Sequence, residues 1–259
     1  MLALAEVSIF FIILARIAGI MMMIPGFGDR SVPGRVRLMI AFALTMVIAP
    51  IMIDYVPTYT GNPGNYVMLL ISELTIGLFL GITIKLLLSA VEVMGMVAGF
   101  QMGLLNAFVQ NPVETRQAPL LGTFLLIIVT VLIFVLELHH HIIRGIVDSY
   151  TMMKPGSLPS INDISHDMMT TIVRTAQEAF VLALRLAAPF IVMGTCYFIG
   201  LGLLNRLMPQ LQVFFIMQPF QILAGMVLLS VLLAVTVPTF MEALERLVLT
   251  HFQRGGEAL

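Results

Sequence analysis

The chain has 259 residues, of which 59% are hydrophobic and only 10% carry a charge. Soluble domains are about half apolar and about a quarter charged, so this composition excludes a soluble globular protein and predicts an integral membrane protein. The net charge of −1 gives no sign of nucleic-acid binding. The single cysteine, Cys196, excludes a disulfide within the chain.

Six apolar runs have lengths near the roughly 20 residues that cross a bilayer. None of them alternates apolar and polar residues with the period of two that is typical of strands, so all six are predicted to be helices. They cover residues 7–24, 38–53, 69–88, 120–138, 180–204 and 213–237. The sequence therefore predicts an all-α, multi-helix integral membrane protein with about six long apolar helices. No basic region precedes the first run, so we expect that run to be retained.

Basic residues indicate the topology. The connection at residues 25–37 carries Arg30, Arg35 and Arg37 against one acid, and the positive-inside rule places it in the cytoplasm. The next connection, residues 54–66, contains no Lys or Arg and is predicted to lie outside.

Arg16, Glu73 and Lys85 are ionisable residues inside apolar runs. Such residues face protein or water rather than lipid. Glu73 and Lys85 are about 18 Å apart along a helix axis, so each needs a partner elsewhere in the fold or in another subunit. For Arg16 we expect a buried ion pair or a side chain that reaches toward the membrane surface.

The central stretch at residues 95–119 interrupts the apolar pattern. Gly95, Gly99 and Gly103 recur every four residues, which places them near one helix face and lets another backbone approach closely. Polar residues and two prolines then end the helix.

No motif of a common enzyme class is present. The sequence has no phosphate-binding P-loop, no H-E-x-x-H and no C-x-x-C. Consecutive helical residues are about 100° apart, so His139, His140 and His141 cannot converge on one metal ion from one helix. We therefore expect no enzyme activity, no cofactor and no metal, which leaves a membrane scaffold or a conduit.

Four blocks of sequence resemble the FliR family of flagellar type III secretion export-gate membrane proteins. GLLNRLMPQLQVF at residues 202–214 resembles the signature turn of that family, and RSVPGRVR at residues 30–37 resembles its first loop. GFQMGL at residues 99–104, followed by Asn111-Pro112 and Ala118-Pro119-Leu120, resembles the central block. HHIIRGIVDSY at residues 140–150 resembles a fourth block, although His139 stands where glycine is more usual. The four blocks occur in the same order as in the family, and the resemblance covers almost the whole chain.

The resemblance implies a core subunit of the flagellar type III protein export gate, in the bacterial inner membrane at the flagellar basal body. FliP-like and FliQ-like membrane subunits would form with it, in a helical assembly, the pore that exports unfolded flagellar proteins. An FlhB-like subunit would contact the pore entrance. Residues 1–175 would be a FliP-like helical portion, and residues 176–259 a FliQ-like helical hairpin with a C-terminal tail.

Residue roles also follow from the resemblance. A loop near residues 104–117 would enter the pore and plug it, although an ordinary cytoplasmic connector remains the alternative. The hairpin turn, which the alternating count of connections places in the cytoplasm, would contact a partner through Asn205, Arg206, Pro209 and Gln210. Arg16, Glu73 and Lys85 would pair across subunits. The loop residues expected to form the plug are Leu104, Leu105, Asn106, Phe108, Val109, Gln110, Asn111, Pro112, Glu114 and Arg116.

Three other functions remain open from the sequence. The first is the injectisome counterpart of the same superfamily, against which GLLNR favours the flagellar branch. The second is a secondary transporter of small solutes, for which inverted repeats would be typical; none is visible. The third is a scaffold with no role in gating.

Overall fold

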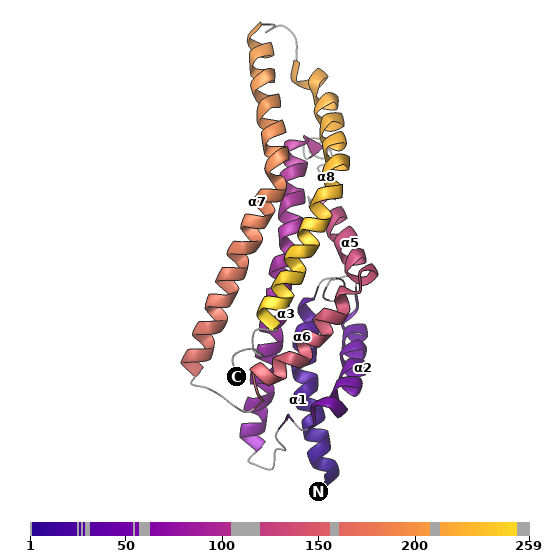
Figure 1. Cartoon of the computed structure of the whole chain (residues 1–259), viewed down its shortest axis with the longest axis vertical. Helices are drawn as coiled ribbons and strands as arrows, with labels where there is room; N and C mark the ends of the chain where they lie inside the picture. Colours follow the sequence, from indigo (N-terminus) through magenta and orange to yellow (C-terminus); the bar gives the residue numbers. More distant parts are fainter. Residues whose placement is uncertain are drawn as a thin grey trace. The chain divides into compact units, whose positions relative to one another are not determined.

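The structure is a computed structural model that describes residues 2–24, 26, 28, 32–53, 55–56, 63–104, 120–155, 161–207 and 213–252. All regular structure in these ranges is helical (Figure 1). The prediction of an all-α protein is confirmed. The helices are α1 (Leu2–Met23), α2 (Gly34–Met52), α3 (Pro63–Gln101), α5 (Leu120–Val135), α6 (Leu138–Met152), α7 (Ile161–Leu207) and α8 (Val213–Phe252).

Four of these helices, α2, α3, α7 and α8, are long and apolar enough to cross a membrane. There are five candidates if α5 and α6, which are joined by a sharp bend, count as one broken span. The apolar part of α1 is shorter than a full span, so the number is slightly below the six runs. A multi-helix membrane protein is confirmed.

Three helices are much longer than the membrane is thick. α3, α7 and α8 contain 39, 47 and 40 residues. At 1.5 Å per residue they measure about 58, 70 and 60 Å, whereas the hydrocarbon core of a bilayer is about 30 Å thick. Each therefore extends well beyond one crossing of the apolar core.

The chain divides into two compact units that interleave along the sequence. One contains Met1–Leu87, Ile133–Ala176 and Leu244–Leu259, and the other contains Leu88–Leu132 and Gln177–Ala243. One division follows Ala176, close to the border expected at residue 175, but α3 and α7 each contribute to both units. The division into a FliP-like and a FliQ-like part stays a prediction.

The first unit is built on α1, whose Ile12, Ile13, Ile17 and Ile20 are fully buried. α1 and α2 lie side by side (Figure 1), with an edge-to-face contact between Phe10 and Phe42 at 5.1 Å between ring centroids. α1 also approaches α3 at glycines.

The approach of α1 to α3 is backbone against backbone. A Cβ atom at Gly19 would lie 2.7 Å from the Leu74 carbonyl oxygen, and one at Gly77 would lie 2.9 Å from the Arg16 carbonyl carbon. Neither position has room for a side chain, so small residues set the distance between these two helices.

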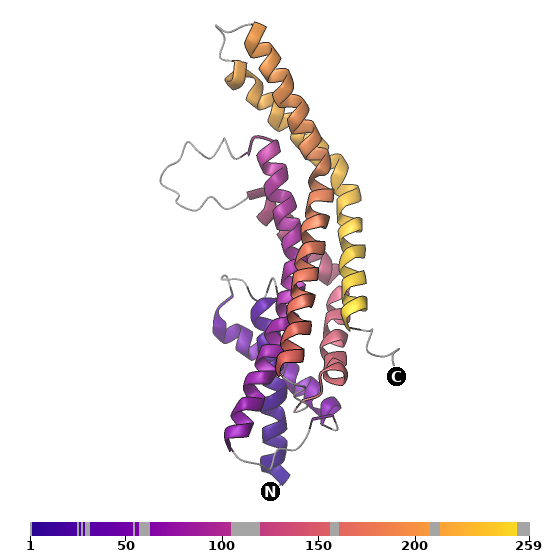
Figure 2. The same cartoon turned by 90° about the vertical axis from the view of Figure 1, so that its left-hand side faces the viewer.

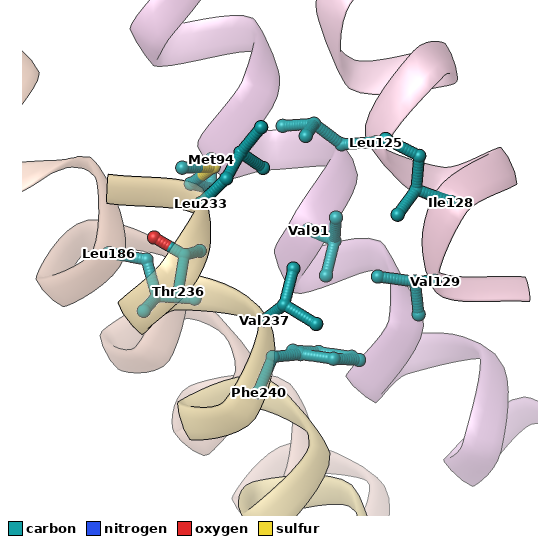
Figure 3. A pocket seen from close by; sticks show the side chains of 10 residues that line it. All are labelled: Val91, Met94, Leu125, Ile128, Val129, Leu186, Leu233, Thr236, Val237 and Phe240. Carbon is teal, nitrogen blue, oxygen red and sulfur yellow. The ribbon is translucent and has the colours of Figure 1, made fainter. Parts of the chain in front are cut away.

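In the second unit, the segments of α7 and α8 after Gln177 and before Ala243 run antiparallel to each other (Figure 2). Side chains from α3, α5, α7 and α8 surround a cavity of about 10 Å³ (Figure 3). That is room for about one water molecule, far below the volume of a ligand pocket. Thr236 is the only polar residue in its lining, which consists of Val91, Met94, Leu125, Ile128, Val129, Leu186, Leu233, Thr236, Val237 and Phe240.

Candidate functional site

The three glycines of the central stretch have different surroundings in the second unit. A Cβ atom at Gly95 would lie 2.7 Å from the backbone nitrogen of Gly122 in α5, so the two helices cross glycine against glycine. At Gly99 the nearest atom, Cβ of Leu121, would be at 3.7 Å, an ordinary contact. Gly95 therefore determines how closely α5 approaches α3, and Gly99 does not.

Gly103 lies beyond the last residue of α3 and ends the helix. Its φ of 74° is in the left-handed region that favours glycine. Its N–H donates to the carbonyl of Phe100 at 3.0 Å, and the N–H of Met102 donates to the carbonyl of Ala98 at 2.9 Å. This is the usual chemistry of a helix C-terminus closed by glycine.

The end of α3 lies against three residues that we call the α3 seat: Gly194 of α7, and Gln221 and Gly225 of α8. Nε2 of Gln221 donates to the carbonyl oxygen of Gln101 at 2.7 Å, and Gln221 is only 2% exposed. Gly225 faces the fully buried side chain of Met102, and Gly194 faces the side chain of Gln101.

Most of the predicted plug falls outside the described residues. Leu104 is half-buried at the end of the described range. The structure gives no account of the other predicted members, which are Leu105, Asn106, Phe108, Val109, Gln110, Asn111, Pro112, Glu114 and Arg116.

The predicted hairpin turn is described in part. Asn205 and Arg206 are exposed near the C-terminal end of α7, whereas Pro209 and Gln210 lie outside the described residues. Arg206 is in the last helical turn, where a cation interacts favourably with the helix dipole.

Arg16 is the centre of a buried polar cluster in the first unit, formed by Arg16, Glu73, Ser149, Tyr150 and Met153. The exposed fractions of the Arg16 and Glu73 side chains are 0% and 1%, and Nε of Arg16 lies 2.6 Å from Oε2 of Glu73. The other two guanidinium nitrogens donate to Ser149 Oγ at 3.2 Å and to the Met153 carbonyl at 2.8 Å. The guanidinium carbon lies 4.0 Å from the centre of the Tyr150 ring.

This geometry corrects the expectation that Arg16 and Glu73 pair across subunits. They pair with each other inside one chain, because Gly19 and Gly77 bring α1 and α3 close enough for the side chains to meet. Lys85 is exposed and makes no hydrogen bond or ion pair with the residues that the structure describes.

Three of the residues in these sites, Ser149, Tyr150 and Gln221, were not predicted as functional. Gln221 carries a detectable signal, since it is an amide inside an apolar run and such groups are buried only with a partner. Ser149 and Tyr150 carry no comparable signal, because hydroxyl groups are common near helix ends. Both sites hold helices together through charge and hydrogen bonds, which suits positioning rather than chemical conversion of a substrate.

A family of known proteins matches nearly the whole chain. The family is described as bacterial export proteins, family 1, and its model covers residues 7–247. The chain belongs to this family. The family and the apolar helices together make it a multi-pass protein of the bacterial inner membrane.

Similar proteins from several bacteria carry the name flagellar biosynthetic protein FliR. The relative from Caulobacter vibrioides is 30% identical over 88% of this chain and 90% of its own length. Those from Bacillus subtilis and Escherichia coli are 29% and 28% identical, over 87% and 91% of this chain and 86% and 88% of their own lengths. The predicted resemblance to the FliR family is confirmed.

Proposed function

We propose that this chain is a core subunit of the flagellar type III protein export gate. The observation that carries the proposal is the match, along almost the full length of each protein, to relatives named flagellar biosynthetic protein FliR. No relative found points to an injectisome protein or to a transporter of small solutes. The chain acts in the gate by binding and positioning, without an enzymatic step.

The surface of the helices supports an assembly with other membrane subunits. In the most apolar 18-residue stretch of α8, only 17% of the residues are buried within the chain. In the corresponding stretch of α7, 28% are buried. Large apolar side chains such as Phe215, Phe220 and Val231 are more than half exposed. We propose that FliP-like and FliQ-like subunits and lipid cover such surfaces, and that an FlhB-like subunit lies at the entrance of the pore.

We further propose that the loop near residues 104–117 plugs the pore while no protein is being exported. Two observations support this role. The chain leaves α3 through a fixed glycine turn at Gly103, and the preceding helix is held against α5 at Gly95. Leakage of ions across the inner membrane is the quantity that tests the plug.

The function is tested by removing the gene in frame. Cells without the chain are expected to secrete no flagellar subunits and to be non-motile, and a plasmid copy is expected to restore both properties. The chain purified in mild detergent is expected to carry FliP-like and FliQ-like subunits with it. Normal secretion in the clean deletion would overturn the proposal, and a chain that transports a small solute when purified alone would favour the transporter.

A further inference from the structure

We propose that Gln221 of α8 is a positioning residue that fixes the point at which the chain leaves α3. All the contacts of Gln221 that support this role lie within the second unit. The functional consequence rests on the proposed export function, because only there does the segment after α3 have a role.

A hydrogen bond from α8 closes the C-terminal end of α3. The last carbonyl groups of a helix have no partner within the helix, and Gln101 is the last residue of α3. Its carbonyl accepts the Nε2 hydrogen of Gln221, a residue 120 positions away in the chain. A buried amide without a partner is costly, so α8 is held where this bond can form.

The end of α3 has little space around it. Gln221 and Gly225 are four residues apart and lie on the same face of α8. A Cβ atom at Gly225 would lie 2.9 Å from Cβ of Met102, and one at Gly194 would lie 2.9 Å from the Gln101 side-chain carbonyl carbon. The end of α3 therefore fits between α7 and α8 in one position, and a shift along either helix would bring it against larger side chains.

Gln221 also lies against the glycine at which the backbone leaves α3. Gly103 turns the backbone with a φ of 74°, and a Cβ atom there would lie 2.9 Å from Oε1 of Gln221. The turn thus needs glycine for its dihedral angle and for the space that Gln221 occupies. One side chain of α8 contacts both the last carbonyl of α3 and the glycine that redirects the chain.

The consequence is a mechanical connection between the last hairpin and the segment that follows α3. A displacement of α8 near Gln221 moves the origin of that segment. In the proposed gate, contacts made by the hairpin with neighbouring subunits would therefore reach the segment through Gln221.

The experiment measures the position of the α3 end directly. In the full-length chain with Cys196→Ala, spin labels replace Phe100 and Leu223, which are 59% and 63% exposed. Double electron–electron resonance is expected to give one narrow distance distribution. Gln221→Leu, which keeps the approximate side-chain size but removes the amide, is expected to broaden or shift the distribution by several Å.

The matched control is Gln218→Leu, the same change one turn earlier at a half-buried position of α8. It is expected to leave the distribution unchanged. An unchanged distribution in Gln221→Leu, or equal broadening in both variants, would overturn the positioning role. If Gln221→Leu does not accumulate, Gln221→Asn gives the same decision, because it keeps the amide but is one methylene too short for the bond.

Ion leakage in cells separates this inference from the proposed function. A broadened distribution with raised leakage supports both. A broadened distribution with leakage equal to that of the parent supports the positioning role of Gln221 and counts against the plug.

Discussion

Arg16 keeps a positive charge inside an apolar interior because its three nitrogens and the face of its guanidinium all have partners. A buried ion pair of this kind adds little stability compared with apolar residues of the same size, but losing one partner leaves the other charge buried alone. The intact pair therefore adds little to the free energy of unfolding, whereas removing one partner lowers that free energy strongly.

Arg16→Ala is expected to lower the free energy of unfolding by about 3–5 kcal/mol, since it leaves the Glu73 carboxylate buried without a counter-ion. Denaturant titration of the purified chain in detergent measures the change. The double variant Arg16→Met with Glu73→Leu is expected to recover most of the loss, because no buried charge remains.

Arg35→Ala is the matched control, since Arg35 is exposed on α2. Its effect is expected to stay within about 0.5 kcal/mol. A loss in Arg16→Ala no larger than in Arg35→Ala would contradict the account of the cluster.

The cluster was only half predictable from the sequence. A charge inside an apolar run indicates a buried partner or a side chain that reaches toward the membrane surface, and the structure shows the first of these for Arg16. The identity of the partner does not follow, because Glu73 is 57 positions away and only the approach of α1 to α3 brings the two together. The resemblance to known gate proteins favoured pairing across subunits, which the geometry replaces with pairing inside the chain.

The contact of α3 with α5 depends on two glycines rather than on a stripe of three. Gly95 and Gly122 lie against each other's helix, whereas Gly99 has space beside it. Spacing in sequence places residues on one face of a helix but does not say which of them the neighbouring helix crosses.

Gly95→Ala is expected to push α5 away from α3 and to destabilise the second unit by about 1–3 kcal/mol, as overpacking commonly does. Gly99→Ala is expected to be neutral or stabilising, since alanine favours a helix over glycine by up to about 1 kcal/mol. Denaturant titration of both variants in the same detergent gives the comparison. Equal losses in the two variants would show that the crossing at Gly95 is not the close contact described.

The helices begin and end at other residues than the apolar runs do. Hydrophobicity marks where side chains avoid water, whereas a helix begins and ends where its backbone groups find other partners. The run at residues 69–88 thus lies inside α3, which starts at Pro63, a residue favoured in the first turn, and ends just before Gly103. The run at residues 120–138 ends near a break in the helix, where Glu137 adopts a left-handed φ of 57°.

At the scale of the molecule, composition and periodicity were sufficient for the all-α membrane fold, and four sequence blocks for the family. The interleaving of the two units was not predictable. Each unit takes one part of α3 and one part of α7. The apolar run within α3 ends at residue 88 and that within α7 begins at residue 180, close to the two divisions, but hydropathy does not say which helical segments pack together.

The barrier to ions is a property of the whole gate, and the predicted plug is tested at that scale. Shortening residues 106–117 is expected to raise ion leakage across the inner membrane while the gate still assembles, because less chain remains to fill the pore. Leakage is measured as the loss of membrane potential in cells that are not exporting.

Shortening residues 57–60, in the connection between α2 and α3, serves as the control and is expected to leave the potential unchanged. Co-purification of partner subunits establishes that each variant assembles. Unchanged leakage in an assembled gate with the shortened segment 106–117 would remove the plug role.

The pairing of Arg16 with Glu73 also has a consequence for the order of events during synthesis. α1 emerges from the ribosome first, and the carboxylate that neutralises its arginine follows 57 residues later. At about 5–20 residues per second that interval is about 3–11 seconds. Until then Arg16 has no counter-ion, and an unpaired charge in an apolar environment is costly. The packing of α1 is therefore completed only after α3 has been made.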